Sequence, residues 1–241
     1  MLNSEVIQEN TLSYSLSKEV LQGDKVQMFI ALLDKSLRPM EDGGTSLSFQ
    51  ESIQPLDCFD YWNRRKEQRY YVLLTKAAFS LNKPITAFNQ ESLTDVGYIQ
   101  QTVKEYEVRE MAENLFFLKG GVMSPDFYFR LHFLRPKQEV LPAEFTEALQ
   151  YIQGQHPDLG TPDLLTIQHN YDYSRVMLHR TSEMSVVVSA YYEVNSGKTL
   201  QLNYTLSYIY NLPPDLLGGS EVLMDGIRKG ALAVVQSARA I

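Results

Sequence analysis

Apolar and polar residues alternate most regularly in the segment 199–212. Every second position there is Leu or Tyr, namely Leu200, Leu202, Tyr204, Leu206, Tyr208, Tyr210 and Leu212. The positions between them carry Gln, Asn, Thr and Ser, with Ile209 as the exception. Because successive side chains of a β-strand point to opposite faces, this pattern predicts a long strand with one apolar and one polar face. Such a strand requires neighbouring strands and an apolar layer against one face.

The rest of the second half of the chain also favours strands. Alternation or short apolar runs predict strands at 127–134, 164–171, 173–180 and 185–194. The tetrapeptide Asn195-Ser196-Gly197-Lys198 is typical of a hairpin turn, with Gly197 free to adopt a positive φ. Two helices are expected, a short one at 143–153 that follows Pro142 and a C-terminal one at 220–239.

The first half of the chain shows apolar residues at helical spacing instead. This spacing predicts helices at 25–37, 60–81 and 92–118, with Lys119-Gly120-Gly121 ending the last of them. The run Tyr70–Leu74 leaves a short strand open as an alternative within the second helix. Residues 40–56, rich in Gly, Ser and acidic residues, are expected to form a loop.

These patterns predict an α+β fold. A mainly helical N-terminal half, 1–120, would pack with a C-terminal antiparallel sheet, 121–241, of about five strands. Helices would cover one face of that sheet, and the other face would be polar. Whether the two halves form one integrated domain or two is left open, because no obvious linker separates them at Gly120-Gly121.

Composition narrows the function. A net charge of −7 over 241 residues argues against a nucleic-acid partner, and no apolar stretch is long enough for a membrane span. A single cysteine, Cys58, excludes an internal disulfide and a cysteine-based zinc site. The N-terminus lacks signal-peptide features. We expect a cytoplasmic protein if Met1 is the native start, and a periplasmic or secreted one if a leader was removed.

Histidines and one aspartate are the candidate catalytic residues. His132, His169 and His179 all fall in predicted strands and could meet on one sheet face, but their spacing matches no metal-ligand motif, so we expect no metal. Asp172 follows His169 closely enough to act with it as general base and orienter. The same residues suit a tight turn, and the structural interpretation is favoured for all four.

Tyrosines are the candidate ligand-binding residues. Tyr204, Tyr208 and Tyr210 would line a cavity if the C-terminal helix stood away from the sheet. If that helix packs closely, as the small residues Gly226 and Gly230 favour, the three tyrosines are core.

Two hypotheses of function follow. The first is a soluble, non-catalytic bacterial α+β protein that binds a protein partner or a small ligand without a cofactor, and a second copy of the chain is one candidate partner. The second is a small-molecule enzyme, hydrolase-like or metal-dependent, with its His/Asp site on the polar sheet face. The absence of nucleophile motifs and of phosphate-binding loops favours the first.

Overall fold

The structure of the chain is a computed structural model. It describes residues 38–40, 47–55, 71–122, 124–175, 182–195 and 197–209, together with positions 225, 229, 233, 234 and 237.

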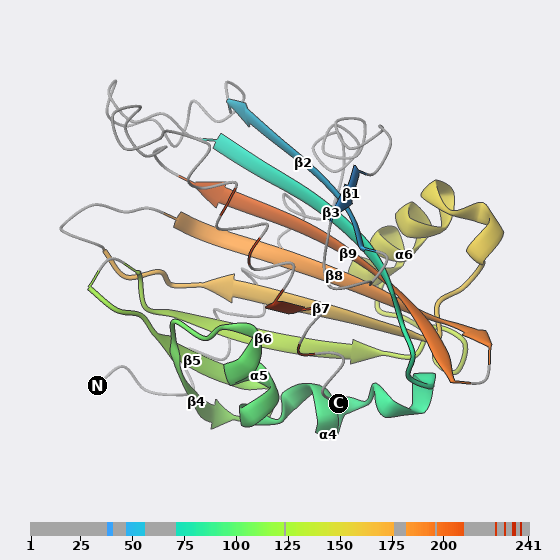
Figure 1. Cartoon of the computed structure of the whole chain (residues 1–241), viewed down its shortest axis with the longest axis horizontal. Helices are drawn as coiled ribbons and strands as arrows, with labels where there is room; N and C mark the ends of the chain where they lie inside the picture. Colours follow the sequence, from blue (N-terminus) through green and yellow to red (C-terminus); the bar gives the residue numbers. More distant parts are fainter. Residues whose placement is uncertain are drawn as a thin grey trace.

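The described chain is organised around one antiparallel sheet of nine strands (Figure 1). The strand order is β1-β2-β3-β9-β8-β7-β6-β5-β4. The strands are β1 Arg38–Met40, β2 Leu47–Pro55, β3 Tyr71–Leu81, β4 Glu107–Ala112, β5 Leu115–Lys119, β6 Phe127–Leu134, β7 Leu164–Tyr171, β8 Ser182–Asn195 and β9 Lys198–Ile209.

The predicted long strand occupies the middle of this sheet. It is β9, which pairs along its whole length with β3 on one side and with β8 on the other. The β8–β9 connection is the predicted hairpin, with Asn195 opposite Lys198 and Gly197 at φ 100°. The strands predicted at 127–134, 164–171 and 185–194 are confirmed as β6, β7 and β8.

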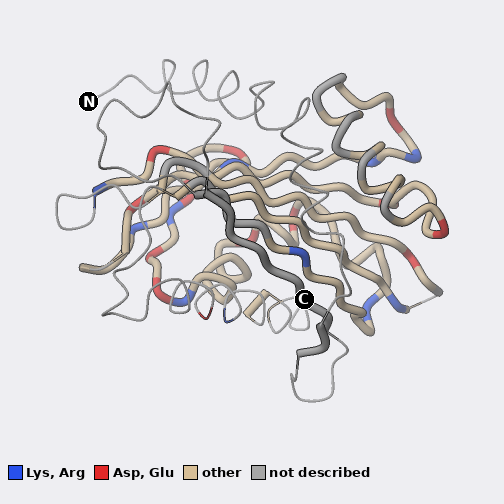
Figure 2. The backbone as a smooth tube through the Cα atoms, turned by 90° about the horizontal axis from the view of Figure 1, so that it is seen from above, with Lys and Arg blue, Asp and Glu red and all other residues tan. Residues whose placement is uncertain are grey.

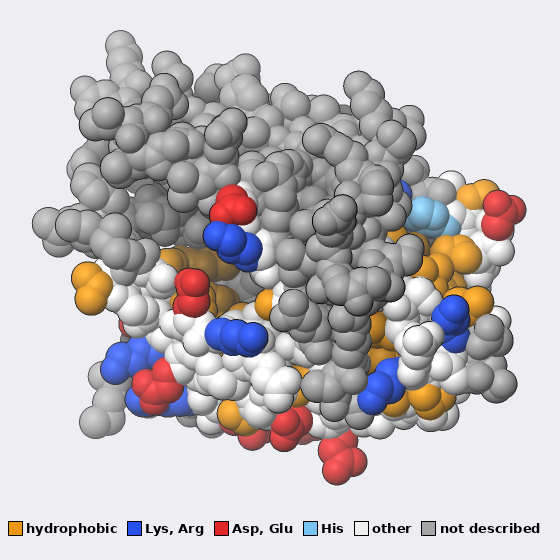
Figure 3. Space-filling model, viewed as in Figure 1, with side chains coloured by type: hydrophobic (Ala, Val, Ile, Leu, Met, Phe, Trp, Pro, Cys, Tyr) orange, Lys and Arg blue, Asp and Glu red, His pale blue; other side chains and the backbone are white. Residues whose placement is uncertain are grey.

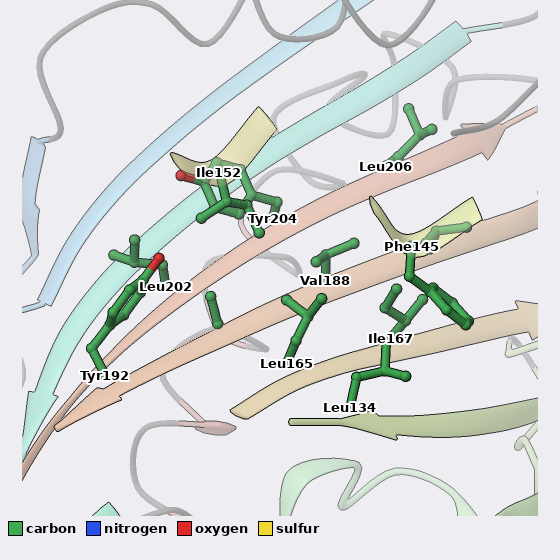
Figure 4. Packing of buried hydrophobic residues seen from close by; sticks show 12 residues of the cluster. Leu134, Phe145, Ile152, Leu165, Ile167, Val188, Tyr192, Leu202, Tyr204 and Leu206 are labelled. Carbon is green, nitrogen blue, oxygen red and sulfur yellow. The ribbon is translucent and has the colours of Figure 1, made fainter. Parts of the chain in front are cut away.

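One face of the sheet packs against α6, Ala143–Gln155, which confirms the predicted short helix. Phe145 and Ile152 of α6 point onto a buried cluster that includes Leu165, Val188 and Leu202 (Figure 4). Ile152 is 1% exposed and Leu165 is 0% exposed. The apolar side chains of β9 thus face α6, as the alternation requires.

The other face of the sheet carries α4, Gln90–Thr94, and α5, Val96–Thr102. Asn89 caps α4 in a reciprocal capping box with Ser92, and the Asp95 carboxylate accepts a 2.8 Å hydrogen bond from the Tyr98 amide at the start of α5. Figure 2 shows the sheet as a layer with helical segments on either side. The described C-terminal positions 225, 229, 233, 234 and 237 are helical as well.

The prediction of a mainly helical N-terminal half beside a sheet of about five strands is wrong. Residues 71–81 form β3, and 107–119 form the β4–β5 hairpin with Asn114 at φ 58°. In β3 the consecutive residues Thr75, Lys76 and Ala77 are each at most 8% exposed, so both faces are covered there and this part of the strand shows no alternation.

The expected single helix over 92–118 and the single covered face are also corrected. Met111 and Leu115 have helical spacing in the sequence, but they lie on different strands, β4 and β5, on either side of the turn at Asn114, and are 54% and 6% exposed. The expected loop at 40–56 contains β2, and helices lie against both faces of the sheet. Residues 173–175 are not in a strand; the rest of 173–180 and the predicted helix at 25–37 lie outside the described residues.

Candidate ligand cavity

A cavity of about 200 Å³ lies between the sheet and the helices of the α5 face. Its apolar lining comes from α4, α5 and strands β5 and β6: Leu93, Ile99, Leu118, Phe127, Phe129 and Leu131. Val234 of the C-terminal segment adds to this lining. The cavity is therefore bounded by elements from both halves of the chain.

The part of the lining that comes from the three central strands is largely polar. Its polar residues are Thr166, Gln168, Asn170, Ser189, Gln201 and Asn203, which come from β7, β8 and β9. These are the residues that alternate with the apolar, α6-facing positions of the same strands. The sequence predicts helices on one face of the sheet only, whereas in the structure helices cover this polar face as well.

Hydrogen bonds between side chains hold this polar surface in place. Gln201 donates from Nε2 to the Tyr191 hydroxyl at 3.1 Å and to Asn203 Oδ1 at 2.9 Å. Gln168 donates to Asn170 Oδ1 at 2.8 Å, and Asn170 in turn donates to Ser185 Oγ at 2.7 Å. Because these bonds run between neighbouring strands and along them, the amide groups are fixed in orientation.

The carbonyl oxygen of Gln201 is the exception in this network. Gln201 is 2% exposed, and its Oε1 has no hydrogen-bond partner among the residues that the structure describes. A buried acceptor without a donor costs about 1–3 kcal/mol, so such atoms are rare in proteins. Here the acceptor belongs to a residue that lines a cavity, where a ligand donor could reach it.

The cavity has no charged lining among the described residues. Burial raises the pKa of Tyr98 to about 12, and burial raises the pKa of Tyr191 as well, so both hydroxyls are neutral at physiological pH. The face of the molecule seen in Figure 3 shows Lys and Arg side chains interspersed with Asp and Glu, without one dominant sign. The site therefore suits an uncharged molecule.

The structure places two of the predicted histidines, His132 and His169, on the opposite face of the sheet. His169 of β7 is 1% exposed, and burial, followed by the nearby charge of His132, lowers its pKa to about 4. His132 of β6 contacts the Phe145 ring of α6 at a centroid distance of 5.6 Å. Asp172 follows β7 at φ 56° and is exposed, so it occupies a different environment from the buried His169. His179 lies outside the described residues.

The predicted ligand-binding tyrosines do not line this cavity where they can be placed. Tyr204 is 4% exposed within the α6-facing cluster, and its hydroxyl lies 2.8 Å from His156 Nε2. The Tyr208 side chain and the whole of Tyr210 lie outside the described part of the chain.

One sequence signal could have identified the cavity lining. The polar positions of 199–207 are Thr, Gln, Asn and Ser, without a single Lys, Arg, Asp or Glu. A solvated strand face normally carries charges, whereas a buried polar face must use groups that neighbouring amides and hydroxyls can satisfy.

Two further properties follow from the described residues. No group of three His, Cys, Asp or Glu side chains among them is placed to hold a metal ion. None of the helices in the described ranges is long and apolar enough to cross a membrane.

The chain matches no protein-family model and no curated protein. Similar solved structures include a conserved protein from Geobacillus kaustophilus, with a TM-score of 0.36 and 11% identity over 68% of this chain and 95% of that one. The human StarD13 (DLC2) lipid transfer and protein localization domain has a TM-score of 0.42 and 10% identity over 98% of each chain. Likenesses at these TM-scores carry no argument about function.

Proposed function

We propose that this protein binds a small, uncharged, amphipathic molecule in the cavity between α5 and the centre of the sheet. The observation that carries the proposal is the buried Gln201 carbonyl oxygen, which lacks a partner in the described structure and belongs to the cavity lining. A ligand that donates one hydrogen bond to this oxygen would relieve its desolvation cost. The apolar lining from Phe127, Phe129 and Leu131 would hold the rest of the ligand.

The size of the cavity limits the ligand. An engineered cavity of about 150 Å³ in another protein holds benzene, so a cavity of about 200 Å³ accommodates a ring with a short substituent. Charged ligands are disfavoured because the described lining offers no opposite charge to offset their desolvation. The ligand class is thus a compact apolar body with one neutral donor.

A pair of matched compounds tests both parts of this proposal. We expect 4-propylphenol to bind the full chain in isothermal titration calorimetry, and propylbenzene, which lacks the donor, to bind about 10-fold more weakly. In Gln201→Met, which removes the acceptor at nearly constant length, the phenol should lose this advantage and bind like propylbenzene.

Gln153→Met is the matched control. Gln153 lies on α6 and donates to Thr161 Oγ1 at 2.9 Å, away from the cavity lining, so its loss should leave phenol affinity unchanged. If neither compound binds at millimolar concentration, the cavity proposal is overturned. Equal affinity of the phenol for the wild type and for Gln201→Met would overturn the role of Gln201.

A further inference from the structure

On the sheet face opposite the cavity, a partly buried arginine has two buried donor atoms without a partner among the residues that the structure describes. Arg130 of β6 lies directly opposite His169 of β7 in the sheet register. Its Nε and Nη2 atoms are buried, and neither has a hydrogen-bond partner within the described ranges. Both ring nitrogens of His169 are likewise buried without a partner there. Unused donors of two side chains therefore lie together where two strands meet.

Arg130 differs in this respect from the basic residues that form ion pairs. Arg109 pairs with Glu107 at 2.6 Å and Lys137 pairs with Asp163 at 2.7 Å. Arg130 has Leu115 opposite it on β5 and His169 opposite it on β7, so neither cross-strand neighbour is acidic. Buried N–H donors of a charged group that lack an acceptor are unfavourable, which points to an anion from outside the described residues.

The two unused atoms of Arg130 define the geometry of that anion. Nε and Nη2 form one edge of the planar guanidinium group, and their N–H bonds along this edge are parallel. That edge matches two oxygens of a carboxylate or phosphate group in a bidentate pair. A neutral imidazole supplies one further N–H, and the pKa of His169, lowered to about 4 by burial and by His132, keeps its ring neutral near pH 7.

A row of aromatic rings continues from this edge across the same face. His169 stacks on Tyr171 at a centroid distance of 5.1 Å with an interplanar angle of 12°. Tyr171 stacks on Tyr128 at 5.9 Å, and Tyr128 contacts Phe117 at 5.0 Å. Planar apolar surfaces beside a bidentate cation suit an oxyanion attached to an organic group.

We propose that Arg130 and His169 form a second binding site, for the carboxylate or phosphate group of a small organic anion. The oxyanion accepts two hydrogen bonds from the Arg130 edge and a third from His169. Its organic part lies against the rings of Tyr171 and Tyr128. This site is on the opposite face of the sheet from Gln201 and does not depend on the cavity.

Thermal unfolding of the full chain with simple anions tests the site. We use benzoate and phenyl phosphate as probes, methyl benzoate as the uncharged comparison, and a cationic buffer with chloride so that no buffer oxyanion competes. At about 100 times its Kd, a bound probe should raise Tm by about 5–10 °C. Any shift that methyl benzoate causes by binding in the cavity should be the same in the wild type and in Arg130→Met, because that binding does not involve Arg130. The larger shift of the two anions identifies carboxylate or phosphate as the preferred group.

Substitutions at Arg130 provide the decisive comparison. Arg130→Met should abolish the anion-dependent shift while leaving Tm without anion equal to or above that of the wild type, because two buried donors without an acceptor are removed. Arg130→Lys keeps a charge but loses the fork, and anion affinity should fall about 10-fold. Arg109→Met, at an exposed position on β4, is the matched control and should respond like the wild type.

Two results would overturn the proposal. One is an equal anion shift in the wild type and in Arg130→Met. The other is the absence of any anion-dependent shift in the wild type. If Arg130→Met then also has a lower Tm than the wild type, the Arg130 donors are hydrogen-bonded by the protein itself. Gln201→Met should keep the full anion response, so a failure of this site and a failure of the cavity proposal are distinguishable.

Discussion

Gln201 of β9 lies directly opposite Tyr191 of β8, and its amide nitrogen is 3.1 Å from the Tyr191 hydroxyl. Both residues are at most 4% exposed, so a polar pair occupies the centre of the sheet beneath its helical cover. An apolar pair at the same positions would bury more apolar surface and leave no acceptor unsatisfied. Retaining polar groups there is consistent with a binding role, because binding sites are where proteins depart from the most stable packing.

Replacing this pair should separate stability from binding. We expect Gln201→Met to leave the free energy of unfolding within about 1 kcal/mol of the wild type, since removal of the unsatisfied carbonyl offsets the lost hydrogen bonds. Tyr191→Phe should cost about 1 kcal/mol, because it removes one partner of a buried hydrogen bond. Urea unfolding measures both values. A loss well above about 2 kcal/mol in Gln201→Met would show that removal of the unsatisfied carbonyl does not offset the hydrogen bonds lost by Tyr191 and Asn203.

His169 should make the stability of the protein depend on pH in acid. Its pKa in the folded state is about 4, whereas an unperturbed histidine has a pKa of about 6.5. As pH falls through about 6.5, the unfolded chain binds a proton that folded His169 does not, so stability is lost until about pH 4. Burial opposes its protonation most, and the nearby charge of His132 of β6 adds to this.

The variant His169→Phe isolates this effect. It keeps an aromatic ring against Tyr171 and removes the titrating group. Between about pH 7 and pH 4 the wild type should lose about 3 kcal/mol more unfolding free energy than the variant, which corresponds to the difference in pKa. Denaturant unfolding at several pH values, in cationic buffers, measures the two curves. Parallel curves would mean that His169 protonates freely in the folded state.

The sequence predicts the sheet best where one face differs chemically from the other. In β9 the Leu and Tyr positions against α6 contrast with Gln, Asn and Ser on the cavity side, and the strand and its hairpin at Gly197 are as expected. In β3 the two faces do not differ in this way, because consecutive residues are buried on both of them. The apolar residues of this segment therefore match the spacing of a helix. The errors in the first half of the chain have this physical origin.

The candidate site is harder to predict than the fold. The alternation in β9 shows that Gln201 and Asn203 share a face, but whether water or a helix covers that face depends on α5 and Val234. Both α5 and Val234 are distant in sequence from Gln201 and Asn203, and neither belongs to a recognisable motif. Similarly, the cross-strand register of Arg130 and His169 follows from the pairing of β6 with β7, which local patterns do not specify.

Packing of α6 on the sheet should be a major source of stability. Ile152 is 1% exposed in the cluster that α6 forms with the strands, so Ile152→Ala should destabilise the protein by about 3–4 kcal/mol through lost apolar burial and a residual cavity. Val140→Ala is the control, since Val140 is 97% exposed and its truncation should change stability by less than about 0.5 kcal/mol. Equal urea midpoints for the two variants would contradict the packing of α6.

Two glycines should respond to alanine in opposite directions. Gly197 sits in the β8–β9 hairpin at φ 100°, where a Cβ is strained, so Gly197→Ala should destabilise the protein by about 1–2 kcal/mol. Gly154 lies in the last turn of α6 with open space where a Cβ would project, and alanine there should add about 0.5–1 kcal/mol by restricting the unfolded chain. Because both variants add the same methyl group, thermal unfolding of the pair separates backbone strain from side-chain chemistry. A stabilised Gly197→Ala variant would show that the hairpin does not require a positive φ at residue 197. That result would also contradict the register of β8 and β9 that this turn fixes.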